Sequence, residues 1–262
     1  MTRSDRRRQF KEDLRTIVRG VGGDVLDAGQ AMALMRVLHA LIEESRDAGT
    51  VAPLMGFFHD NMRAAGRAAP RKAIACRLGC SHCCKAWVAA TAPEVLFVKR
   101  SVAPKQREAI RASIDETHRI TGGMDAQERS RISLPCPLLK DNVCQAYAAR
   151  PATCQTAVSG DASICARAFL PGAAEEGIPT PDFYISMRRG YALALAGALK
   201  KAGLPSASYE FNAALSTAFS RADAEAAWLA GEDLFAGVTR EAAGDPFDLP
   251  GNRRLYDAAW AA

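Results

Sequence analysis

The eight cysteines of this 262-residue chain all lie between residues 76 and 165. They occur in the sequences CRLGCSHCC, CPLLKDNVCQAYAARPATC and SGDASIC. Thiolates are the strongest biological ligands for zinc, Cu(I) and iron–sulfur clusters. With 48% hydrophobic residues, a chain of this length can bury a core without disulfide staples. The clustering therefore indicates a protein-bound metal or cluster.

The first cysteine block has unequal spacings, with three residues between Cys76 and Cys80, two between Cys80 and Cys83, and none between Cys83 and Cys84. Two intervening residues let a turning backbone aim both sulfurs at one metal and leave amides to hydrogen-bond the thiolates. The side chains of adjacent residues diverge instead. One of the vicinal pair therefore binds a second ion, bridges two ions or stays free.

The second block adds Cys136, Cys144 and Cys154, which only the fold can bring to the first block. Seven thiols exceed the four of a mononuclear zinc site or of one fully protein-ligated [4Fe–4S] cluster. The sequence thus predicts either two metal centres, or one centre with spare redox-active or non-ligating cysteines. The eighth, Cys165, lies outside this pattern.

Several features of the two blocks coincide: CRLGCSHCC, CPLL, a tyrosine three residues after Cys144, and Arg150-Pro151 before Cys154. In this combination, residues 76 to 155 resemble the zinc- or iron-chelating cysteine-cluster family, the CxxCxxCC or YkgJ-like proteins. The resemblance implies a domain that chelates zinc or iron, with Arg150 and Pro151 as an associated non-ligand pair. It implies metal ligands at Cys76, Cys80, Cys83, Cys84, Cys136, Cys144 and Cys154.

The chain departs from the family pattern at His82, where the family often has glycine, and at Gln155, where it often has arginine. Arg150 has two open roles, because its guanidinium either offsets thiolate charge or caps a carbonyl near Pro151. Glu94 is the carboxylate nearest the first block in the sequence. Its favoured role is to accept hydrogen bonds from the free backbone amides at a helix N-terminus.

The resulting functional hypothesis is a metal-binding protein that chelates iron, as an ion or an iron–sulfur cluster, or zinc. The alternative is an iron–sulfur, S-adenosylmethionine-dependent enzyme, similar to a protein lysine methylase, or a redox enzyme, because flagellin lysine-N-methylase is a relative of this family. Cys76, Cys80 and Cys83 also have the spacing of the radical S-adenosylmethionine signature. The βα alternation and glycine-rich motif that accompany it in such enzymes do not follow.

Other classes of function lack their signatures, since the chain has no Ser-His-Asp set, phosphate loop or Rossmann fingerprint. The charged N-terminus has no export signal, which favours a reducing, cytoplasmic location, and no segment is apolar enough to span a membrane. The net charge of +5 comes largely from a basic arm, residues 1–25. We expect this arm to be solvated, and it offers a contact for a protein partner. No basic helix with stacking aromatics indicates nucleic acid.

The rest of the chain predicts helices. Apolar spacing predicts one from the N-cap Asp27 to Gly49, and others over 53–65, from Thr91, from Pro104 to Gly122, from Thr180 to Gly203, over 208–219 and over 222–230. A short helix is expected over 10–18, and residues 244–251 are expected to be irregular. Between Cys136 and Cys144, the turn formers Asp141-Asn142 predict a tight hairpin-like loop.

Strand signals are scarce, so the predicted fold class is mainly α. We expect one helical domain over residues 26–262, with helices around a cysteine-rich, loop-based metal centre within segment 76–165 and at most a short hairpin.

Overall fold

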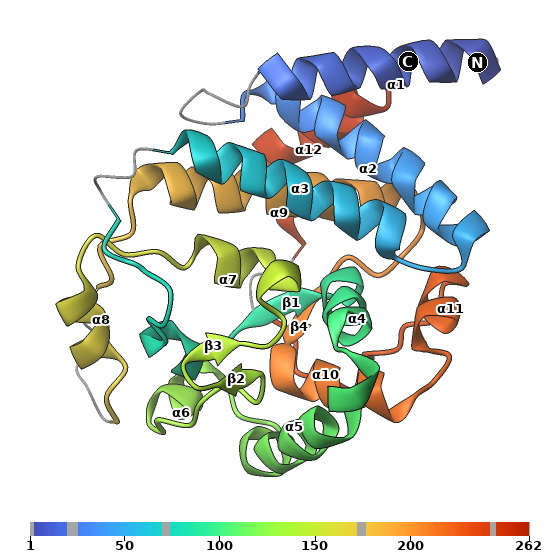
Figure 1. The fold of residues 1–262 in the computed structure, drawn as a ribbon. Helices are drawn as coiled ribbons and strands as arrows, with labels where there is room; N and C mark the ends of the chain where they lie inside the picture. Colours follow the sequence, from blue (N-terminus) through green and yellow to red (C-terminus); the bar gives the residue numbers. More distant parts are fainter. Residues whose placement is uncertain (1–2, 20–25, 70–73, 172–176, 242–244, 262) are drawn as a thin grey trace.

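The computed structural model describes residues 3–19, 26–69, 74–171, 177–241 and 245–261 (Figure 1). Within these ranges the helices are α1 (Arg3–Arg19), α2 (Ala28–Ala48), α3 (Ala52–Ala68), α4 (Ala92–Ser101), α5 (Arg107–Thr121), α6 (Ala126–Ser130), α7 (Ala152–Thr156), α8 (Ala162–Ala168), α9 (Asp182–Lys201), α10 (Phe211–Ser220), α11 (Ala224–Leu229) and α12 (Pro250–Ala259). Strands and 3₁₀ turns are β1 (Ala89–Thr91), β2 (Leu139–Lys140), β3 (Val143–Cys144), β4 (Ser208–Glu210), η2 (His82–Lys85), η3 (Pro104–Gln106), η4 (Tyr147–Ala149) and η5 (Pro246–Asp248). The mainly α class is confirmed.

Helix α2 begins and ends at the residues that the sequence predicted. Asp27 and Gln30 form a reciprocal capping box, in which the Asp27 carboxylate accepts from the Gln30 amide and the Gln30 side chain accepts from the Asp27 amide. Gly49 ends the helix in the left-handed conformation, with φ of 64°, which glycine adopts without steric cost. The apolar face of α2 is buried throughout, including Leu34 and Leu38.

Helix α2 packs most extensively on α9, a helix rich in alanine and glycine. A Cβ at Gly197 would lie 2.8 Å from Met35 Sδ, so the two helices approach more closely than a larger residue would allow. Helices α1, α2, α3, α9 and α12 lie together at the top of Figure 1 and are called the helical layer below. Below this layer lie the remaining helices and both strand pairs.

The N-terminal arm differs from the expectation, because most of it forms α1, longer than the short helix predicted over 10–18. The remainder of the arm, residues 1–2 and 20–25, lies outside the described residues. Helix α1 packs on α2 and buries Ile17. Buried Asp13 pairs with Arg36 at 2.5 Å. Arg6, Arg7 and Arg8 at the start of α1 are exposed, as expected of a solvated arm, whereas Asp13 and Ile17 on the face toward α2 are buried.

Two strand pairs frame the lower half. The β2–β3 hairpin turns through Asp141 and Asn142, both with positive φ (51° and 60°), which confirms the predicted tight turn. The second pair joins distant segments, since β1 pairs antiparallel with β4. Residues 208–210 are therefore strand, and the helix predicted from Ser208 begins only at Phe211, because Glu210 caps it.

The C-terminal tail is also more regular than predicted. Residue 244 lies outside the described residues, but η5 and then α12 follow it. Pro250 opens α12, and the helix packs on α2. No helix in the described part of the chain combines the length and the hydropathy needed to cross a bilayer.

Candidate metal centre

The loop before η2 carries Cys76 and Cys80. Gly79 turns the chain with φ of 85°, and the Cys80 amide closes the turn on the Arg77 carbonyl at 3.0 Å. Ser159 holds the start of the loop from a distant segment: its carbonyl accepts from the Ala75 amide at 2.8 Å, and its amide donates to Cys76 Sγ at 3.3 Å. An amide directed at sulfur stabilises a thiolate, and this is the environment that metal-binding cysteines have.

The vicinal cysteines lie on η2, a single 3₁₀ turn. The Cys84 amide donates to the Ser81 carbonyl and the Ala86 amide to the Cys83 carbonyl, at 3.0 and 3.1 Å. The Cys84 carbonyl in turn accepts from the Cys136 amide at 2.7 Å. This backbone bond joins the two cysteine blocks across some fifty intervening residues.

The hairpin positions the next two cysteines. Cys136 precedes β2, with its carbonyl accepting from the Leu139 amide at 2.9 Å, and Cys144 lies on β3 opposite Leu139. At the turn, Asn142 Oδ1 accepts from the Ser81 hydroxyl at 2.8 Å. The hairpin therefore contacts the first block at both its base and its tip.

Cys154 lies on α7, whose first turn is held by Glu94. The buried Glu94 carboxylate accepts from the amide and hydroxyl of Thr91, at 2.8 and 2.6 Å, which closes the capping box of α4. Its other oxygen accepts from the Ala152 amide at the start of α7, at 2.7 Å. The expected capping role is confirmed, and one carboxylate serves two helix N-termini.

The seven cysteines of the sequence pattern line a single cavity of about 480 Å³, here called the first cavity. A second cavity, of about 180 Å³, is lined by Cys165 on α8 together with Cys76, Cys80, Cys83 and His82. All the thiols are free, and in the described residues Cys165 alone is buried while Cys76 alone is exposed. The fold therefore brings together every cysteine that the sequence singled out.

The thiols surround the first cavity but do not converge on one point. Among the described residues, no three side chains of His, Cys, Asp or Glu already form a group that could hold a metal ion. The donor set nevertheless fits zinc or iron, because the wall carries seven sulfurs and Glu210 as its one carboxylate within the described chain. Coordination of an ion therefore requires rotation of the thiols and small movements of the loops that carry them.

Burial disfavours charge on these sulfurs. It raises the pKa of the Cys136 thiol to about 12 and raises the pKa values of the Cys76, Cys144 and Cys154 thiols. The pKa of Cys83 is raised first by its hydrogen bond with the Cys84 thiol and then by burial. Without a cation these five thiols are therefore neutral at pH 7, and a bound metal would displace their protons.

Arg150 combines the two roles that the sequence left open. Its guanidinium lowers the pKa values of Cys83, Cys144 and Cys154, although burial outweighs this effect. Its Nε also donates to the Tyr147 carbonyl at 3.2 Å, and its guanidinium carbon lies 3.8 Å from the centre of the Tyr147 ring. Arg150 is thus a fixed positive charge on the cavity wall.

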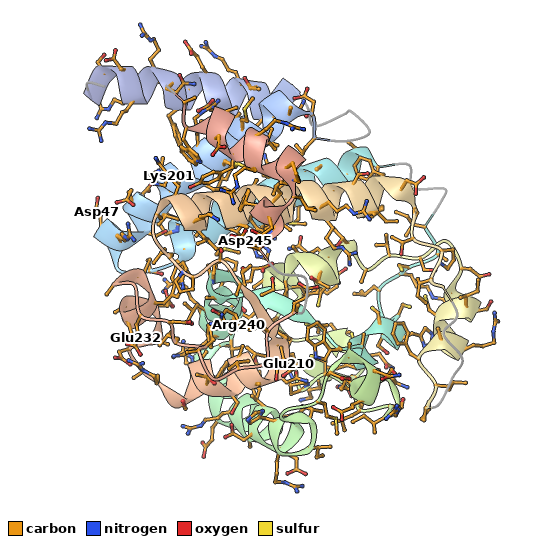
Figure 2. All side chains as sticks on the ribbon, turned by 180° about the vertical axis from the view of Figure 1, so that it is seen from behind. Asp47, Lys201, Glu210, Glu232, Arg240 and Asp245 are labelled. Carbon is orange, nitrogen blue, oxygen red and sulfur yellow. The ribbon has the colours of Figure 1, made fainter. Side chains whose placement is uncertain are left out.

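Four further charged residues of the wall were missed by the sequence analysis: Arg77, Arg129, Arg188 and Glu210. Arg129 is 1% exposed and donates to the carbonyls of Ile132, at 3.2 Å, and of Leu134, while its buried Nε has no partner. Glu210 is also buried and accepts from two amides at the start of α10, and Figure 2 shows it in the half of the molecule away from α1 and α2. The capping box of Asp125 and Glu128 could have located Arg129 on a helix.

His59 packs beneath this site without joining it. Its Nδ1 lies 2.8 Å from Gln155 Nε2, which also donates to the Arg150 carbonyl at 2.8 Å. Because that second contact requires an amide nitrogen, the His59 Nδ1 must accept, so the ring is neutral with its proton on Nε2. Burial lowers the pKa of His59 to about 4. His59 is thus a buried, packed histidine of α3.

Comparison with known proteins adds one match. The model of a family described as "CxxCxxCC: Putative zinc- or iron-chelating domain" matches residues 75–168, about a third of the chain. No curated protein and no solved structure gave a match. The family match supports metal binding and reaches beyond the segment 76 to 155 that the motifs indicated. Residues 75–168, with all eight cysteines, therefore match the CxxCxxCC family of zinc- or iron-chelating domains.

Proposed function

We propose that this protein binds iron or zinc through its cysteine cluster, with thiolate ligands drawn from Cys76, Cys80, Cys83, Cys84, Cys136, Cys144 and Cys154. The observation that carries the proposal is that all seven line one cavity although they come from separate turns, a hairpin and a helix. Chance burial of cysteines in an apolar core would scatter them over several places. Soft sulfur donors gathered on one wall are the donor set of zinc and iron centres.

The charges of the wall also support a bound cation. Several neutral thiols with raised pKa values gain their ligating form only when a metal replaces the protons. Four arginines of the wall, Arg77, Arg129, Arg150 and Arg188, then offset part of the remaining negative charge of a thiolate-rich centre. In a site without metal, four arginines beside neutral thiols would have little to neutralise apart from Glu210.

Elemental analysis and a visible spectrum of anaerobically purified protein test the proposal. We expect stoichiometric zinc or iron, with cysteines protected from alkylation until a chelator is added. Replacement of one proposed ligand, Cys154→Ala, should lower the metal content. The matched control Leu170→Ala, an exposed residue next to Phe169, which lines both cavities, should not. Metal-free protein whose thiols all react freely would contradict the proposal.

The size of the first cavity favours a second candidate function. About 480 Å³ is more than one ion requires, and the wall beyond the sulfurs includes the apolar side chains Trp87, Leu138 and Phe211. An organic cosubstrate would fit there, as in an iron–sulfur, S-adenosylmethionine-dependent methylase or a redox enzyme. Calorimetric titration of the anaerobic protein with S-adenosylmethionine tests this candidate. Colourless protein that holds only zinc and gives no binding heat would exclude it.

A further inference from the structure

The two cavities divide the eight cysteines into overlapping groups. Four thiols lie on the first cavity only: Cys84, Cys136, Cys144 and Cys154. Cys165 lies on the second cavity only, and Cys76, Cys80 and Cys83 line both. Eight thiols on two adjoining cavities are the number that two four-coordinate centres require.

The electrostatic neighbours of the thiols give the same division. Charge on Cys80, Cys83 and Cys165 acts on Cys76, and charge on Cys136, Cys144 and Cys83 acts on Cys154. Such coupling reports proximity. Cys76 and Cys154 therefore belong to different neighbourhoods, and Cys83 lies between them.

The vicinal cysteines Cys83 and Cys84 differ in the cavities that they line. The Cys83 and Cys84 thiols contact each other through a hydrogen bond, so the pair lies where the two cavities adjoin. Both thiols reach the first cavity, but Cys83 alone of the pair also reaches the second. This difference assigns Cys84 to the first cavity and Cys83 to the second.

We propose that the eight cysteines form two four-thiolate centres, one held by Cys84, Cys136, Cys144 and Cys154 and the other by Cys76, Cys80, Cys83 and Cys165. This inference rests on the proposed metal-binding function and assigns Cys165 a ligand role that the sequence pattern did not give it. Each centre takes one divalent zinc or iron ion. Each ligating thiol releases its proton to solvent and donates a sulfur lone pair to the ion, so no oxidant or reductant is needed.

The second centre has its own scaffold. Asp161 caps α8 by accepting from the Ser163 and Ile164 amides, at 2.7 and 3.3 Å, which fixes the turn that carries Cys165. Ser159, two residues before this cap, holds Cys76 by the amide contact to its sulfur. Helix α8 also packs against η2, where Cys83 lies. Three of the four ligands are thus linked by contacts of the described residues.

Zinc stoichiometry of the full chain tests the division. Chelator-treated protein is reloaded anaerobically with Zn²⁺ and dialysed against a weak chelator before analysis. We expect two zinc ions per wild-type chain and one in each of Cys165→Ala and Cys154→Ala. The bound ion should then protect different thiols from alkylation: Cys84, Cys136, Cys144 and Cys154 in Cys165→Ala, and Cys76, Cys80, Cys83 and Cys165 in Cys154→Ala.

A wild-type chain with one zinc ion and four reactive thiols would overturn the two-centre inference and leave the proposed function standing. An unchanged zinc content in Cys165→Ala would also overturn it. No zinc in the wild-type chain would instead refute the proposed function. Because a variant may fail to fold, the number of thiols protected in the wild type, eight against four, decides the question without any substitution.

Discussion

The helical layer and the cysteine segment, here residues 75–86 and 136–157, differ in how they are held together. Leu34, Leu38 and Leu195 are at most 1% exposed and pack between α2 and α9, so apolar burial stabilises the layer without any ligand. In the cysteine segment, short turns carry partly exposed thiols, joined by single backbone bonds such as that from Cys136 to Cys84. The helical layer thus packs through buried apolar side chains, whereas the cysteine segment depends on short turns and single backbone hydrogen bonds.

Metal removal should produce the largest difference in local stability between the two regions. In chelator-treated protein, we expect hydrogen exchange in residues 75–86 and 136–157 to accelerate by about 100-fold or more, equivalent to about 3 kcal/mol of local stability. The amides of α2 and α9 should exchange at unchanged rates, because their burial involves no thiol. Equal acceleration in both regions would show that they form one cooperative unit.

Acidification should act at the boundary between the regions, through His59 on α3. Because burial lowers its pKa from 6.5 to about 4, the unfolded chain takes up a proton in this range and the folded chain does not. The free energy of unfolding should therefore fall by up to about 3 kcal/mol as the pH drops from 6.5 to 4. Denaturant titrations of wild type and His59→Gln compare this loss. A pH dependence that is identical in the two proteins would contradict it.

Glu94 connects α4 to the cysteine segment, so its removal should weaken both. Glu94→Gln offers a donor where the carboxylate accepts from Thr91 or Ala152, and we expect a loss of about 1 to 3 kcal/mol in the free energy of unfolding. Metal affinity should fall as well, because α7 carries Cys154. The control Glu128→Gln alters the same capping-box position on an exposed helix and should cost less than about 0.5 kcal/mol. Equal effects would indicate that burial of Glu94 is unimportant.

The smallest expected effect tests the helical layer alone. Gly197→Ala places a Cβ 2.8 Å from Met35 Sδ and should destabilise the protein by about 1 to 2 kcal/mol without changing its metal content. In α3, a Cβ at Gly56 would meet no atom within 4 Å. Gly56→Ala should therefore stabilise the protein by about 0.5 to 1 kcal/mol. Thermal unfolding of the two variants gives opposite shifts if the α2–α9 contact is as close as it is here.

Local signals predicted much of the fold. The caps at Asp27, Gly49 and Thr91 and the turn at Asp141-Asn142 depend on neighbours a few residues away, so the sequence contains their whole cause. The β1–β4 pair was not predictable in this way, because its partners are over a hundred residues apart and each strand has only three residues. The same distance explains why Ser208 was assigned to a helix.

For the site, the motifs predicted which thiols would gather but not their surroundings. Cysteine spacing and the Arg150-Pro151 step are visible in the sequence, and their residues do line one cavity. The burial of Arg129 could not be predicted, because an arginine among charged residues is expected to be exposed to solvent. The position of Cys165 beside Cys76 depends on the pairing of residues 75–76 with Ser159, which is a tertiary contact.

The β1–β4 pair also fixes an order of events during protein synthesis. Glu210, Phe211 and Asn212 close one side of the first cavity, and they leave the ribosome long after the last cysteine. The nascent cysteine segment therefore emerges with that side open. The first cavity is completed only when β4 pairs with β1. The chain beyond the family match thus closes a cavity whose cysteines all lie within the match.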